Sequence, residues 1–181
     1  NHDANTSWDV RRSHKRQLIW PGSVDLPTFK IVVARVIKKY FKHSSYYKID
    51  GKPVFSIYDM NNLVKGLGGV KQTAEALDYF RSEVKNAGFP GLHLQMIYWN
   101  AVPKIDDSGF ASNKGTAANT IKVFKIDSLT NYQFVLVVGT LALFVRWANK
   151  AISNWPKWSK QFDVPYFPHV SIGWDNQARF K

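Results

Sequence analysis

Apolar residues along the chain alternate between two spacings, one typical of helices and one typical of strands. Phe29, Val33 and Ile37 recur every four residues with cationic residues between them, and this spacing predicts an amphipathic helix. Similar stripes and shorter apolar runs recur further along the chain. The predicted helices cover residues 28–42, 70–87 and 141–162, and the predicted strands cover residues 54–59, 91–98, 121–127 and 168–173.

This alternation of strands and helices predicts an α/β fold with a parallel sheet, because parallel strands need a long crossover that a helix supplies. The sequence holds three βα repeats and a final strand, fewer than a closed (β/α)8 TIM barrel contains. Either the sheet is open, or residues 1–181 are the C-terminal part of a longer TIM-barrel-like domain. The pattern favours the second interpretation, a single incomplete barrel-type domain whose early strands lie upstream of Asn1.

Composition narrows the classes of function. The 181 residues are 45% hydrophobic, enough for one sizeable core, and none of them is cysteine, which excludes disulfides and thiolate metal sites. Histidines and carboxylates do not fall at metal-ligand spacing, so we expect neither a metal nor another cofactor. The longest apolar run, residues 134–145, is shorter than the ~20 residues of a membrane span, and no membrane segment is expected.

The net charge of +12 makes nucleic acid a partner to consider. The positive residues are dispersed, however, and residues 11–16 form their one tight cluster, without a nucleic-acid-binding motif. We therefore expect no nucleic-acid partner. The basic surface faces either anionic glycans or solvent alone. Aromatic residues make up 15% of the chain, and such rings either stack on sugars or fill the core.

Polar and aromatic residues follow several predicted strands. Exits of parallel barrel strands converge on one pocket, so these side chains are candidates for a shared site. Glycoside cleavage normally uses two carboxyl groups, and Asp127 and Asp175 are the predicted catalytic pair. The predicted substrate-binding residues are His2, Asn5, Tyr58, Asp59, Tyr98, Trp99, Asn100, Asn131, Tyr132, Trp174, Asn176 and Arg179.

An alternative role remains open for each aspartate. A carboxylate after a strand often caps the next helix or closes a turn, and this role is favoured for Asp59, which precedes Met60-Asn61-Asn62. His93 falls inside a predicted strand and is expected either to find a hydrogen-bond partner or to face outward.

Five stretches of the chain resemble one known group of proteins in sequence and in order. They are Asn1-His2-Asp3-Ala4-Asn5 with Trp8, Tyr46 to Tyr58 with its Ile-Asp-Gly-Lys-Pro-Val-Phe core, Ala87 to Leu94, Asp127 to Tyr132, and Gly173 to Arg179. This set resembles the glycoside hydrolase family 99-like group, also called the WbsX-like glycosyltransferase domain. The resemblance covers nearly the whole chain.

The resemblance implies a (β/α)8-type carbohydrate-active domain of bacterial polysaccharide loci, located outside the cell, in the periplasm or at the cell surface. The chain departs from true family 99 enzymes because its only glutamates, Glu75 and Glu83, fall on a predicted helix rather than at a strand exit. Their mechanism is therefore not carried over.

We expect a carbohydrate-active enzyme, foremost a glycoside hydrolase acting on a polysaccharide or oligosaccharide. A glycosyltransferase of surface-polysaccharide synthesis and a non-catalytic glycan-binding domain are the alternatives. The sugar, its linkage and the oligomeric state are not specified by the sequence.

Overall fold

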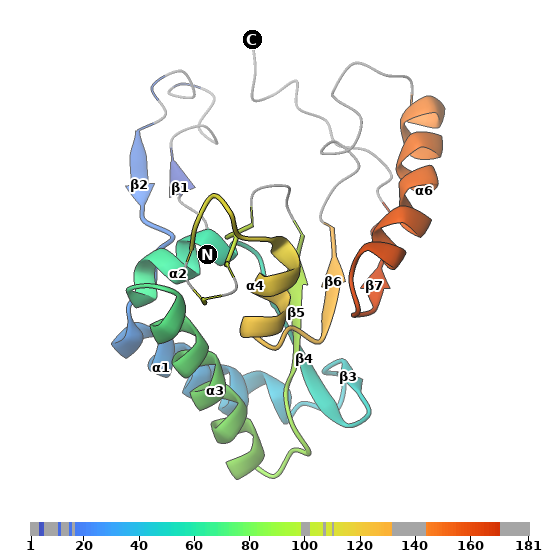
Figure 1. The fold of residues 1–181 in the computed structure, drawn as a ribbon. Coiled ribbons are helices and arrows are strands. Elements are labelled where there is room, and N and C mark those ends of the chain that lie inside the picture. Colours follow the sequence, from blue (N-terminus) through green and yellow to red (C-terminus); the bar gives the residue numbers. More distant parts are fainter. Residues whose placement is uncertain are drawn as a thin grey trace.

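The computed structural model describes residues 4–5, 11, 15, 17–98, 102–106, 108–109, 111–131 and 144–170. Its strands are β1 (Ala4–Asn5), β2 (Leu18–Trp20), β3 (Lys48–Ile49), β4 (Lys52–Ile57), β5 (His93–Ile97), β6 (Ser128–Thr130) and β7 (Tyr166–Phe167). Its helices are α1 (Leu26–Val36) with the π-helical continuation η3 (Ile37–Phe41), α2 (Met60–Leu67), α3 (Val70–Asn86), α4 (Ala117–Val123) and α6 (Phe144–Gln161). Figure 1 shows how these elements are arranged.

One sheet organises the molecule. Its strands lie in the order β3-β4-β5-β6-β7, and β4 to β7 are all parallel, whereas β3 pairs antiparallel with β4. The carboxyl ends of the four parallel strands therefore lie at the same end of the sheet, the upper end in Figure 1. This is the mixed α/β fold predicted from the alternation of strands and helices. The described strands are compatible with an incomplete barrel and do not by themselves form a closed (β/α)8 barrel.

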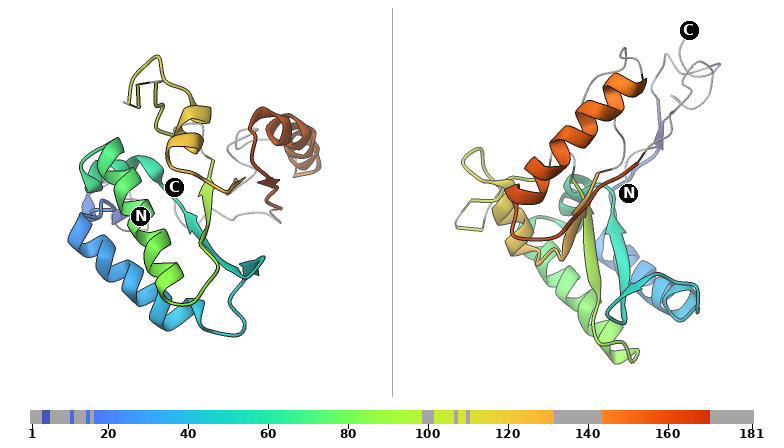
Figure 2. Two further views of the ribbon diagram at one scale, coloured as in Figure 1. Left: turned by 60° about the horizontal axis from the view of Figure 1, so that its bottom comes forward. Right: turned by 90° about the vertical axis from the view of Figure 1, so that its right-hand side faces the viewer.

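The core lies between this sheet and the helices α1, η3 and α3, which gather on one side of β4 and β5 (Figure 2). Phe55 of β4 meets Phe80 of α3 edge to face at 5.1 Å, and Phe41 of η3 stacks on Phe80 at 6.0 Å. Each such aromatic pair contributes about 0.5–1.5 kcal/mol beyond the burial of apolar area. These contacts hold β4 and β5 in place and so position the ends of both strands.

The helices predicted at residues 28–42 and 70–87 and the strands predicted at 54–59 and 91–98 are confirmed by α1 with η3, α3, β4 and β5. α1 begins where the sequence indicated, because Asp25 caps it by accepting a hydrogen bond from Thr28 N at 2.9 Å.

The strand predicted at residues 121–127 is wrong. Residues Ala117 to Val123 form helix α4, and strand β6 begins only at Ser128. Thr116 starts the helix by accepting a hydrogen bond from Asn119 N at 3.1 Å. Ile121 and Phe124 are buried three residues apart, which is the spacing of one helix face, whereas Ile121-Lys122-Val123 imitates the apolar and polar alternation of a strand.

Two further boundaries differ from those predicted. The structure has a strand β7 at Tyr166–Phe167, just before the one predicted at residues 168–173. Residues 168–170 are outside any strand, and residues 171–173 lie outside the described part of the chain. Helix α2 was not predicted at all, although Met60, Leu63 and Leu67 fall at helical spacing on its buried face, because a stripe over only eight residues is a weak signal.

Within the described ranges, none of the helices is long and apolar enough to cross a membrane.

Candidate functional site

The first residues after the parallel strands meet at the carboxyl end of the sheet, as predicted. Tyr58 follows β4, Tyr98 follows β5, Asn131 follows β6 and His169 lies two residues beyond β7. Tyr98 N donates a hydrogen bond to Thr130 O at 2.6 Å, which extends the pairing of β5 and β6 past the last residue of the former. Three of these residues, Tyr58, Tyr98 and Asn131, are predicted substrate-binding residues.

Asn131 is the most constrained of them. Its side chain is buried, with 5% of its surface exposed. Its Oδ1 accepts hydrogen bonds from the Tyr166 hydroxyl at 2.5 Å and from His169 N at 3.3 Å. Burial raises the pKa of Tyr166 well above its usual value, so the hydroxyl keeps the proton that it donates. The amide group of Asn131 thereby ties β7 to the end of β6.

The other half of the same amide is unsatisfied. Among the residues that the structure describes, Asn131 Nδ2 finds no hydrogen-bond acceptor. A buried donor without a partner costs about 1–3 kcal/mol, and such groups are rare in native proteins.

Aromatic rings from α6 and β7 stand beside this amide. Trp158 of α6 contacts the ring of Tyr166 at 5.6 Å, and Phe162 contacts the ring of Tyr98 at 5.2 Å. Between Tyr98 and α6 lies a cavity of about 570 Å³, called here the α6 cavity. Its lining residues are Tyr98, Lys157, Trp158, Lys160 and Gln161. Figure 1 shows α6 on the β7 side of the sheet, rising toward the carboxyl ends of the strands.

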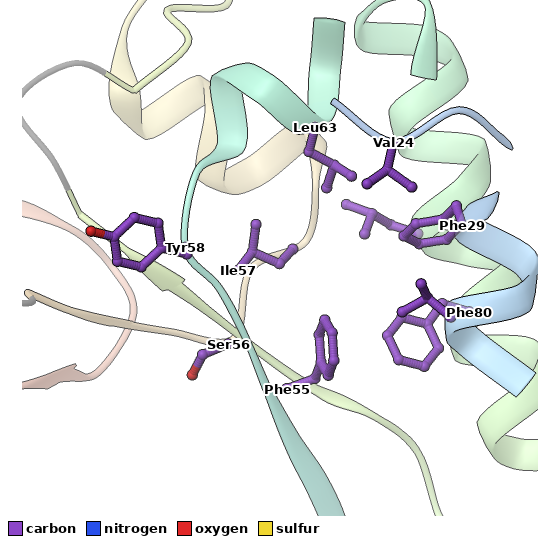
Figure 3. Close-up of a pocket in the computed structure, with 10 residues that line it drawn as sticks. Val24, Phe29, Phe55, Ser56, Ile57, Tyr58, Leu63 and Phe80 are labelled. Carbon is purple, nitrogen blue, oxygen red and sulfur yellow. The ribbon is translucent and has the colours of Figure 1, made fainter. Parts of the chain in front are cut away.

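A second cavity, of about 250 Å³, lies between β4 and the helices α1 to α3. Figure 3 shows Phe55 and Ile57 on its inner side, whereas Ser56 and Tyr58 point to the opposite side of β4. The remaining walls are core residues such as Phe29, and none of the described residues that line it is charged. This cavity therefore lacks the hydrogen-bonding groups that a sugar needs.

Asp59 has the capping role that the sequence favoured. Its Oδ1 accepts from Asn62 N at 3.0 Å and its Oδ2 accepts from Asn62 Nδ2 at 3.1 Å. These bonds start helix α2. The predicted role of Asp59 in substrate binding has no support from these contacts.

The position predicted for Asp127 is wrong. Because residues 117–123 are helical, Asp127 precedes β6 instead of following a strand, and it lies at the opposite end of β6 from Asn131. Its Oδ2 accepts a hydrogen bond from Leu94 N at 2.8 Å, and its own N donates to Leu94 O at 2.8 Å. The carboxylate thus joins β5 to β6 at their amino ends. The predicted catalytic pair with Asp175 required Asp127 to follow a strand, and Asp127 does not follow one.

A row of polar side chains crosses the face of the sheet that points away from Leu94 and the core. Ser56 Oγ donates to Gln95 Oε1 at 2.7 Å, and Gln95 Nε2 reaches Ser128 Oγ at 3.4 Å. Ser128 Oγ in turn lies 2.7 Å from His93 Nε2. His93 is therefore the satisfied strand histidine that the sequence indicated. Its burial lowers its pKa, against a smaller opposing effect of the Asp127 carboxylate.

Several predicted residues lie outside the described part of the chain, and their roles stay predictions. They are His2, Trp99, Asn100, Tyr132, Trp174, Asp175, Asn176 and Arg179. Asn5 is described only as a backbone position in β1.

Sequence reasoning missed the contribution of α6 and β7. Lys157, Trp158, Lys160 and Tyr166 were not candidates, because cations on a helix resemble an ordinary solvated face. The available signal was the absence of any acidic residue from the whole of α6.

The described residues include no group of three or more histidines, aspartates or glutamates that could hold a metal ion. Aromatic rings, a buried amide and ammonium groups are components that a site for a polar, ring-shaped ligand uses. The chain matches the model of the family described as "Glycosyltransferase WbsX" over residues 2–181 and belongs to that family. No curated protein and no solved structure gave a significant match.

The WbsX part of the resemblance is thus confirmed. The likeness to glycoside hydrolase family 99 was not found separately and stays a prediction.

Proposed function

We propose that this protein transfers a glycosyl group to a carbohydrate acceptor at the carboxyl end of the sheet. The observation that carries the proposal is the unpaired, buried Nδ2 donor of Asn131, beside aromatic rings in a member of the WbsX family. An amide N–H donates to a sugar hydroxyl, and the ring of Tyr98 offers a surface for the C–H face of the sugar.

The contacts of Asp59 and Asp127 support transfer over hydrolysis by an aspartate pair that includes either of them. A glycosidase places two carboxyl groups about 5–10 Å apart across the scissile bond. The carboxylate of Asp59 accepts a hydrogen bond from Asn62 N at the start of α2, and that of Asp127 accepts one from Leu94 N at the far end of β6. Neither supplies a second carboxyl group next to Asn131.

Transfer needs one base and a donor with a good leaving group. The acceptor hydroxyl oxygen attacks the anomeric carbon, the bond from that carbon to the leaving group breaks, and the hydroxyl proton passes to the base. We propose Asp175, downstream of β7, as this base. Hydrolysis would follow the same course with water in place of the acceptor, so the acceptor requirement separates the two activities.

The test is to incubate the full chain with nucleotide-activated sugars and an oligosaccharide acceptor, and to look by mass spectrometry for acceptor enlarged by one sugar unit. Asn131→Ala should lower kcat/KM about 5- to 150-fold, which is the effect of one lost hydrogen bond of about 1–3 kcal/mol. Lys71→Gln on the exposed side of α3 should leave the rate unchanged.

Other outcomes would replace the proposal. Shortening of the oligosaccharide without any donor would mean a hydrolase, the activity first expected from the sequence. Binding of glycans without any turnover would mean a glycan-binding domain.

A further inference from the structure

Helix α6 is strongly cationic. Its sequence contains Arg146, Lys150, Lys157 and Lys160 and no aspartate or glutamate. Among the described residues, neither Lys157 nor Lys160 forms an ion pair, and the nearest acid in the sequence, Asp163, is exposed and does not line the α6 cavity. The two ammonium groups that line this cavity therefore form no ion pair with a carboxylate of the described chain.

The cavity adjoins the site proposed above. Tyr98 lines it and also donates its N–H to Thr130 O, next to Asn131. On the other side, Trp158 lines it and contacts Tyr166, whose hydroxyl binds Asn131 Oδ1. A ligand in the cavity and a sugar at Asn131 would thus be neighbours.

We propose that the α6 cavity is a subsite for an anionic sugar unit, held by Lys157 and Lys160 and flanked by the rings of Tyr98 and Trp158. This inference rests on the proposed function and names its substrate class. An ammonium group donates charge-assisted hydrogen bonds to a carboxylate or phosphate oxygen, and an aromatic ring takes the apolar face of the same unit. The amide of Gln161 adds a donor and an acceptor for hydroxyl groups.

Two kinds of ligand carry an anionic group that the two lysines would bind in the same way. It is either the carboxylate of a uronic acid in the acceptor or the phosphate of an activated sugar donor. The α6 cavity is an open cleft rather than an enclosed pocket, so a unit at the end of a longer ligand can enter it.

Calorimetry on the full chain separates these sources. Three probes are titrated: trigalacturonate, its neutral methyl ester, and a nucleotide diphosphate sugar. Tighter binding of trigalacturonate than of its ester, by about tenfold or more, identifies a uronate subsite. Tight binding of the nucleotide sugar alone identifies a donor-phosphate subsite.

The decisive variant is the double substitution Lys157→Gln and Lys160→Gln. It should weaken binding of the preferred anionic probe at least about tenfold and leave binding of the neutral ester unchanged. The matched control is Lys71→Gln with Lys122→Gln, which removes the same charge from exposed positions on α3 and α4 and should have no such effect.

Equal affinity of the protein for the charged and the neutral probe would contradict the proposed subsite. An equal loss of affinity in the control variant would contradict it as well. So would a single-stranded oligonucleotide that binds more tightly than any of the sugar probes. Failure of the proposed function is seen separately. In that case the charge-dependent binding persists while no enlarged acceptor forms.

Discussion

The hydroxyl of Tyr166 lies 2.5 Å from Oδ1 of Asn131 and donates a hydrogen bond to it, across 35 residues of sequence. This bond sets the orientation of the amide, because an oxygen that accepts from both Tyr166 and His169 N must be the carbonyl end of the side chain. The Nδ2 donor is thereby turned away from both partners. The unpaired donor on which the proposed function rests is a consequence of this contact.

Tyr166→Phe should therefore impair both stability and sugar binding. The change leaves Asn131 Oδ1 with one donor instead of two and should lower the free energy of unfolding by about 1–3 kcal/mol. The affinity for glycans should fall as well, because the amide is no longer held in one orientation. Urea denaturation and glycan titration measure the two effects. Tyr47→Phe at an exposed position is the control, and equal effects of both variants would contradict the role of this bond.

Substitution of Asp127 distinguishes its observed contact from its predicted catalytic role. Asp127→Ala removes the acceptor of Leu94 N and should destabilise the protein by about 1–3 kcal/mol. Asp127→Asn keeps an acceptor oxygen and should retain most of the stability and of the transfer rate. If Asp127→Asn abolished turnover in a fully folded protein, Asp127 would be a catalytic residue after all. The measurements are urea denaturation and the acceptor-enlargement assay.

Because Asp59 caps α2, substitutions of Asp59 should lower the free energy of unfolding by different amounts. Asp59→Ala should lower the free energy of unfolding by about 0.5–2 kcal/mol, because Asn62 N loses its acceptor at the start of α2. Asp59→Ser should recover most of this loss, since a serine hydroxyl also caps helices. Thermal denaturation of the three proteins checks the order. A loss of glycan affinity in the serine variant without loss of stability would instead support the predicted binding role.

The sequence allowed prediction of the elements with a strong local signal. α1 and α3 have long apolar stripes, and β4 and β5 are short, largely apolar runs that follow glycine or proline, so local preference and final structure agree. α4 was mistaken for a strand because β-branched Ile121 and Val123 alternate with a lysine over a helix of only seven residues.

The candidate site could be predicted only in part, for a physical reason. The parallel order of strands brings Tyr58 and Tyr98 to one end of the sheet, as the local pattern predicted. Asn131 joins them at the end of β6, a strand that the local pattern misplaced. The bond between Asp127 and Leu94, and the contact of Trp158 with Tyr166, depend on packing between distant segments. No local spacing specifies such contacts.

His93 should make stability depend on pH. Burial lowers its pKa from the ordinary value of 6.5, so the unfolded chain binds a proton at a pH where the folded chain does not. The stabilisation is therefore complete above pH 6.5 and is lost as the pH falls through the range below it. Once protonated, His93 Nε2 can only donate to Ser128 Oγ and can no longer accept from it. The urea midpoint should thus fall between pH 7.5 and 5.5. His93→Gln should reduce this fall, and an equal fall in that variant would exclude His93 as its source.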